Sequence, residues 1–60
     1  MTGHEMIKLL KKHGWYIDRI HGSHYVLKRD GKIVVVPVHS GKDLPKGLEN
    51  SLKKQIEKKI

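Results

Sequence analysis

The sequence contains no cysteine, which excludes a disulfide framework and any zinc site built on thiolates. Its longest uninterrupted run of apolar residues, Ile33–Val36, is far shorter than the roughly 20 residues that span a bilayer. The first residues lack the pattern of a signal peptide. We therefore expect a protein of the reducing cytoplasm with no membrane partner.

Acidic residues are scarce, since six Asp and Glu stand against thirteen Lys and Arg, for a formal net charge of +7. The field of such a protein attracts polyanions, and nucleic acid is the first candidate. Charge alone does not decide the matter, because a lysine-rich surface also keeps a small protein in solution.

The chain is short, and its 60 residues leave room for one hydrophobic core, so we expect a single domain over residues 1–60. A domain of this size buries only about 60% of the surface that its unfolded chain exposes, which makes its stability marginal. A partner that adds buried surface is therefore expected.

Helix signals stand at both ends of the chain. Thr2 and Glu5 have the spacing of a capping box, and Gly14 supplies a stop after an amphipathic stretch. Near the other end, Asp43 and Pro45 suit a helix start. Aliphatic residues then recur every four positions at Leu48, Leu52, Ile56 and Ile60.

Between the helices the sequence is rich in β-branched and aromatic residues, which predicts three strands at about residues 15–21, 23–29 and 32–38. Asp30-Gly31 is a strong two-residue hairpin signal, and His21-Gly22 is a weaker one. The predicted fold is α+β in the order α-β-β-β-α, with a three-stranded antiparallel sheet and both helices on one face. Double-stranded-RNA-binding domains have this order too.

Alternation does not show which sheet face holds the core, because both faces are apolar. The competing sets are Ile17, Val26, Ile33 and Val35 on one face, and Tyr25, Leu27, Val34 and Val36 on the other.

The two predicted turns bring separated polar residues to one end of the sheet. The first turn pairs Arg19 with His24, and the second pairs His24 with Pro37. His39 follows on the same side, two residues beyond Pro37.

RNA cleavage without a metal needs a base for the ribose 2′-OH, an acid for the leaving oxygen and a cation near the phosphate. His24, Arg19 and His39 are the candidates, since histidine exchanges protons near neutral pH. Ser23 is not a nucleophile activated by His24, because adjacent strand residues point to opposite faces. The remaining histidines are interpreted as a first-turn, a helix-end and a turn residue, namely His4, His13 and His21. We expect no metal and no cofactor, because no third ligand accompanies His21 and His24.

Several short motifs follow one another along the chain: Gly14-Trp15, Arg19, Gly22-Ser23-His24, Val36-Pro37-Val38-His39 and Lys46-Gly47. This ordered set resembles HicA toxins over essentially the whole chain. The family often has threonine after the last glycine of the set, where this sequence has Leu48, which affects only a helix-start polar contact.

The resemblance implies an mRNA interferase with a double-stranded-RNA-binding-like fold that a HicB antitoxin neutralises. It implies that His24 is catalytic, that Gly22 and Ser23 present it, and that Arg19 and His39 occupy motif positions with possible supporting roles. Candidates for RNA contact are the lysines Lys28, Lys46, Lys53 and Lys54.

Three hypotheses of function follow. The first is a metal-independent endoribonuclease acting on mRNA, with His24 as general acid or base. The second is a non-catalytic RNA-binding module of the double-stranded-RNA-binding type, which would bind in a salt-sensitive way and leave RNA intact. The third is a small protein-interaction domain whose charge serves to find an acidic partner.

Overall fold

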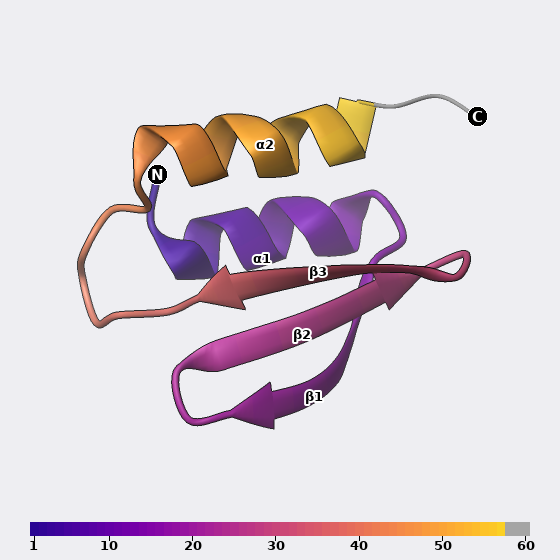
Figure 1. Cartoon of the computed structure of the whole chain (residues 1–60), viewed down its shortest axis with the longest axis horizontal. Helices are drawn as coiled ribbons and strands as arrows, with labels where there is room; N and C mark the ends of the chain where they lie inside the picture. The colour runs from indigo at the N-terminus through magenta and orange to yellow at the C-terminus, as the bar shows by residue number, and fades with distance from the viewer. Residues whose placement is uncertain (58–60) are drawn as a thin grey trace.

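The computed structural model describes residues 1–57, and the predicted apolar position Ile60 lies outside them. The elements in chain order are α1 (Gly3–Lys12), β1 (Tyr16–His21), β2 (His24–Arg29), β3 (Lys32–Pro37) and α2 (Lys46–Glu57) (Figure 1). The strands form one antiparallel sheet in the order β1-β2-β3, with β2 in the centre. The predicted α+β class and the order α-β-β-β-α are confirmed.

The start of α1 is the predicted capping box. The hydroxyl of Thr2 accepts the Glu5 N–H at 3.2 Å, and the Glu5 carboxylate accepts the Thr2 N–H at 2.8 Å. These bonds hold the pKa of Glu5 below its usual value. At the other end, Gly14 has a φ of 91°, the left-handed backbone that a helix stop requires.

The second helix, α2, begins at Lys46, directly after Pro45, whose carbonyl accepts the Glu49 N–H at 2.9 Å. The predicted helix start is confirmed. Neither α1 nor α2 is long and apolar enough to cross a membrane, and these are the helices of the described residues.

The β2–β3 hairpin has the predicted register. Asp30 and Gly31 have φ values of 47° and 78°, and positive φ at both positions is what a type I′ turn needs. His24 lies opposite Pro37, and Val26 lies opposite Val35, as predicted.

The β1–β2 hairpin differs from the prediction. Its two-residue loop is Gly22-Ser23, so His21 lies opposite His24, and Arg19 lies opposite Val26. The expected pairing of Arg19 with His24 is wrong. A type I′ turn at His21-Gly22 would force positive φ on a histidine, whereas Gly22, at 56°, takes the position where a type II′ turn favours glycine.

A β-bulge interrupts β1 between Ile17 and Arg19, and Asp18 is the extra residue. Ile17 lies opposite Leu27 as a result. Without the extra residue, alternation would turn Ile17 away from the side of the sheet that carries Leu27. The bulge therefore allows Ile17 to pack against the core while Arg19 lies on the opposite face.

One face of the sheet, which we call the core face, packs against the helices. Its buried residues are Leu27, Val34 and Val36. The rest of the buried core comes from both helices and the segments that flank them, and consists of Met6, Ile7, Leu10, Trp15, Leu44, Leu52 and Ile56. The ambiguity between the two apolar sets is thus resolved in favour of the set containing Leu27, with Ile17 added by the bulge.

The other face, which we call the open face, has no element of the described chain packed over it. By register it carries Tyr16, Arg19, His21, His24, Val26, Lys28, Ile33, Val35 and Pro37. Ile33 is 59% exposed and Val35 is 45% exposed, although both are apolar. This face is where residues of the fold are available to a ligand or partner.

The first turn of α1 lies against the end of β3. A Cβ on Gly3 would be 2.6 Å from the Pro37 carbonyl oxygen and 3.0 Å from a Val38 methyl. Only glycine allows this approach without a shift of the backbone.

The variant Gly3→Ala is therefore expected to lower the free energy of unfolding by about 1–3 kcal/mol, because the added methyl overpacks a backbone contact. Chemical denaturation measures the change. The matched control is Gly47→Ala, where a Cβ meets no atom within 4 Å and the better helix propensity stabilises by up to about 1 kcal/mol. Equal effects of the two substitutions would show that the α1–β3 contact is not as close as described.

Candidate active site at the end of the open face

His24 is the first residue of β2 and is exposed on the open face. Its neighbours across the sheet are His21 on β1 and Pro37 on β3. Residues directly opposite one another on paired strands project to the same side, with Cβ atoms about 4.5–5.5 Å apart. His21, His24 and Pro37 therefore form one row across the end of the sheet, which we call the histidine row.

The turn beside this row is hydrogen-bonded to the chain that follows β3. The Ser23 carbonyl accepts the Val38 N–H at 2.7 Å, so the chain leaving β3 continues to pair with the turn. Gly22 supplies the positive φ that reverses the chain. Both predicted motif residues thus have a structural part in placing His24 at the sheet end.

Arg19 lies on the open face one row further along, opposite Val26. Diagonal neighbours of this kind are about 7–8 Å apart, which is within reach of a long side chain. Its Nε donates to the Asp18 carboxylate at 3.0 Å, and its side chain is 59% exposed. Arg19 is near His24, although not directly across from it.

Asp18, the bulge residue, is a participant that the sequence analysis missed. Its carboxylate also lies 3.5 Å from Lys28 Nζ, so it joins cations from two strands. The hydrogen bond from Arg19, followed by the charge of Lys28, holds the pKa of Asp18 below its usual value. A residue inserted by a bulge carries no signal in a period-two pattern, which explains why it was missed.

His39 lies outside the strand pairs of the sheet. It follows β3 by two residues, is exposed, and its carbonyl accepts the Lys42 N–H at 2.8 Å in the segment that leads to α2. The predicted gathering of Arg19, His24 and His39 is therefore only partly reproduced by the sheet register. The second histidine in the row is His21, which sequence reasoning assigned to a turn.

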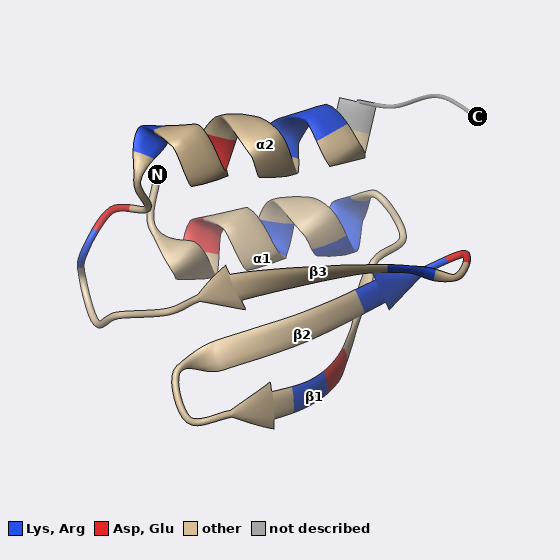
Figure 2. Cartoon of the chain, viewed as in Figure 1, with Lys and Arg blue, Asp and Glu red and all other residues tan. Residues whose placement is uncertain are grey.

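The four predicted RNA-contact lysines fall into two groups. Lys28 is paired with Asp18, and Lys53 donates to Glu49 at 3.2 Å. Lys46 and Lys54 are exposed on α2 and make no ion pair with any side chain in the described part of the chain. Figure 2 shows cationic segments on both helices and near the β2–β3 turn, whereas the β1–β2 turn at the other end of the sheet carries none.

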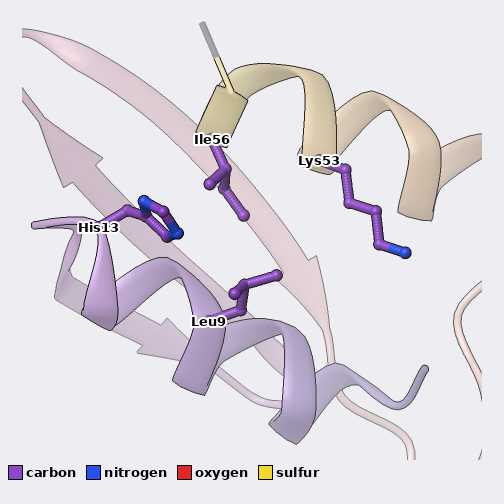
Figure 3. Close-up of a pocket in the computed structure, with 4 residues that line it drawn as sticks. All are labelled: Leu9, His13, Lys53 and Ile56. Carbon is purple, nitrogen blue, oxygen red and sulfur yellow. The ribbon is translucent and has the colours of Figure 1, made fainter. Parts of the chain in front are cut away.

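A separate cleft of about 370 Å³ lies between the two helices, lined by Leu9, His13, Lys53 and Ile56 (Figure 3). Leu9 and Ile56 make its wall largely apolar, and His13 is the one histidine among its described lining residues. It lies in the helical layer and contains no residue of the histidine row. Residues 1–57 contain no cluster of three or more His, Cys, Asp or Glu side chains able to hold a metal ion.

A comparison with protein families gives a match. The family model described as HicA toxin of bacterial toxin-antitoxin matches residues 3–57. No curated protein and no solved structure matches the chain. The match includes every element from α1 to α2 and the whole histidine row.

The ion pairs of Asp18 predict a pH effect on stability. Because the pKa of Asp18 is lowered in the fold, its charged form stabilises the protein above about pH 4, and this contribution is lost as the pH falls through the lowered value. The variant Asp18→Asn lacks the contribution at every pH. Thermal unfolding should therefore separate parent and variant at pH 6 to 7, and the difference should shrink below about pH 4. A difference that is the same across this range would contradict the ion-pair account.

Proposed function

This chain belongs to the HicA toxin family of bacterial toxin–antitoxin systems, and from that premise we propose that it is a metal-independent endoribonuclease that cleaves mRNA in the cytoplasm. His24 is its general base or acid. The observation that carries the proposal is the exposure of His24 in a row with a second histidine, with an arginine in the next row.

Metal-independent RNA cleavage needs the kinds of group that this site contains, namely imidazoles and a guanidinium. A neutral imidazole takes the proton of a ribose 2′-OH, the 2′ oxygen attacks the neighbouring phosphorus, and the leaving 5′ oxygen needs a proton from an acid. Negative charge grows on the phosphoryl oxygens during attack, and a nearby guanidinium stabilises it. Arg19 is the proposed cation, because its side chain is 59% exposed and shares the open face with His24. Its bond to Asp18 runs through Nε, and a guanidinium has further N–H donors for a phosphate. His39 remains a proposed further contact beyond the row.

Lys28 of β2 and the three candidate lysines of α2 are proposed to bind the RNA backbone away from the point of cleavage. Lys46 and Lys54 are the more available, whereas Lys28 and Lys53 must first leave Asp18 and Glu49. For single-stranded RNA, each lysine that neutralises a phosphate makes the slope of log K against log salt concentration steeper by about 0.7.

The alternative function is a non-catalytic RNA-binding module, which the exposed lysines of α2 favour on their own. The two functions differ in their products. A binder shifts RNA and leaves it intact, whereas the endoribonuclease yields fragments in the presence of a chelator.

The toxin–antitoxin family implies an antitoxin partner, and we propose that a HicB antitoxin covers the open face. Three large apolar side chains of this face are about half exposed, namely Tyr16, Ile33 and Val35. Clustered exposed apolar residues on a small protein mark an interaction surface. A partner seated there would also cover the histidine row and so block RNA.

The proposed activity is tested with His24→Ala. The variant should cleave RNA about 10²- to 10⁴-fold more slowly than the parent, because general acid–base catalysis contributes an effect of this size. It should also lose toxicity when expressed from a tightly controlled promoter. Cleavage is followed on a labelled RNA with chelator present.

The matched control is His13→Ala, which removes an exposed histidine in the helical layer and should cleave as the parent does. If His24→Ala cleaves and poisons cells as well as the parent, His24 is not catalytic. If the parent binds RNA but produces no fragments, the binding module is the correct function.

The antitoxin surface is tested with Val35→Asp in the non-toxic His24→Ala background. A buried unpaired carboxylate at the interface should weaken binding of the antitoxin encoded by the neighbouring reading frame by more than about tenfold. Calorimetric titration measures the affinity. The control is Ser51→Asp, which adds the same charge to an exposed position of α2. Comparable affinities of the two variants would move the antitoxin surface away from the open face.

A further inference from the structure

We propose that His21 is the second catalytic histidine, so that His21 and His24 act as a complementary acid and base across the β1–β2 hairpin. This inference rests on the proposed ribonuclease activity and deepens it. It starts from one observation: His21 and His24 are a directly opposed pair, and both are exposed.

The hairpin makes this pair rigid. His21 is the last residue of β1 and His24 is the first of β2, so only the two residues Gly22 and Ser23 separate them. The Ser23 carbonyl is fixed by the Val38 N–H, which anchors the turn to the chain beyond β3. Side chains of directly opposed residues start about 4.5–5.5 Å apart at Cβ and share one face. Two imidazoles that diverge from this separation can lie on either side of one phosphate.

The reaction needs both protonation states at once. One histidine, neutral, takes the proton from the 2′-OH as the bond from the 2′ oxygen to phosphorus forms. The other, protonated, gives its proton to the 5′ oxygen as the bond from phosphorus to that oxygen breaks. The products are a 2′,3′-cyclic phosphate and a 5′-hydroxyl end, and the protein retains the same number of protons. No water or metal ion is consumed in this step.

The other groups around the pair are compatible with one histidine acting as the base and the other as the acid. Pro37 completes the histidine row from β3 and does not titrate. Arg19 lies in the next row and is paired with Asp18, and Lys28 approaches the same carboxylate from β2. The Asp18 carboxylate therefore lies beside Arg19 and outside the histidine row.

His39 is the competing candidate for the second histidine. It is two residues beyond β3, at the start of a turn closed by the bond from Lys42 N–H to its carbonyl. Among the described residues His39 lies outside the strand pairs, whereas His21 lies directly opposite His24. The geometry therefore favours His21, and an experiment that includes both histidines decides between them.

The experiment compares the purified parent with His21→Ala, His21→Gln, His24→Ala and His39→Ala on one RNA oligonucleotide with a mapped cleavage site, with chelator present. A second oligonucleotide carries sulfur in place of the 5′ bridging oxygen at that site. A thiolate leaves without a proton, so this substrate rescues a variant that lacks the general acid and does not rescue one that lacks the base.

We expect both His21 variants to cleave the ordinary RNA about 10²- to 10⁴-fold more slowly than the parent. The sulfur substrate should restore most of the rate to His21→Ala or to His24→Ala, but not to both. The parent should have a bell-shaped dependence of rate on pH, and each of these variants should lose one limb of it. His13→Ala is the control and should match the parent on both substrates.

Each other result overturns the inference. If His21→Ala cleaves as fast as the parent while His24→Ala is inactive, the ribonuclease function stands and His21 has no part in it. If neither variant is rescued and the pH profile of His21→Ala keeps both limbs, His21 only supports the hairpin. If His39→Ala shows the loss and rescue instead, the second histidine is His39. If the parent produces no fragments, the proposed function fails together with this inference.

Discussion

The turn at Gly22-Ser23 decides which side chains meet at the end of the sheet. Because Gly22 accepts positive φ at the first turn position, the strands pair so that His21 and His24 lie opposite each other. A loop displaced by one residue would put Arg19 opposite His24 and remove His21 from the row. The single chemical requirement of one tight turn thus determines the composition of the candidate active site. The bond from Val38 to Ser23 then ties this turn to the far edge of the sheet.

The bulge at Asp18 is the second determinant of the site, because it places Ile17 and Arg19 on opposite faces of the sheet. Ile17 packs against the core and Arg19 lies beside the histidines, although a regular strand would bring both to the same side. The Asp18 carboxylate is then placed to hold Arg19 and Lys28. In the described part of the chain, the helical side carries most of the lysines (Figure 2). The open side carries the histidine row and the exposed apolar residues.

Local signals in the sequence predicted one helix start and one turn. The capping box of Thr2 and Glu5 and the turn at Asp30-Gly31 were predicted correctly, because each depends on a few neighbouring residues. The first hairpin was predicted with the loop His21-Gly22, whereas the structure has Gly22-Ser23. Both loops contain the same glycine, and they differ in which residues must adopt a positive φ. The core face was not predictable from alternation, because both faces are apolar and the bulge changes the face of Ile17. His24 was recognised from its motif, whereas the place of His21 required the register.

We propose that RNA is bound for cleavage at the histidine row on the open face. The most direct test is an NMR titration of the labelled protein with an RNA oligonucleotide methylated at its 2′ oxygens, which binds without being cut. We expect the largest changes at the imidazoles of His24 and His21 and at Arg19, with smaller changes at the lysines of α2. Changes confined to the helices, with both imidazoles unaffected, would contradict it.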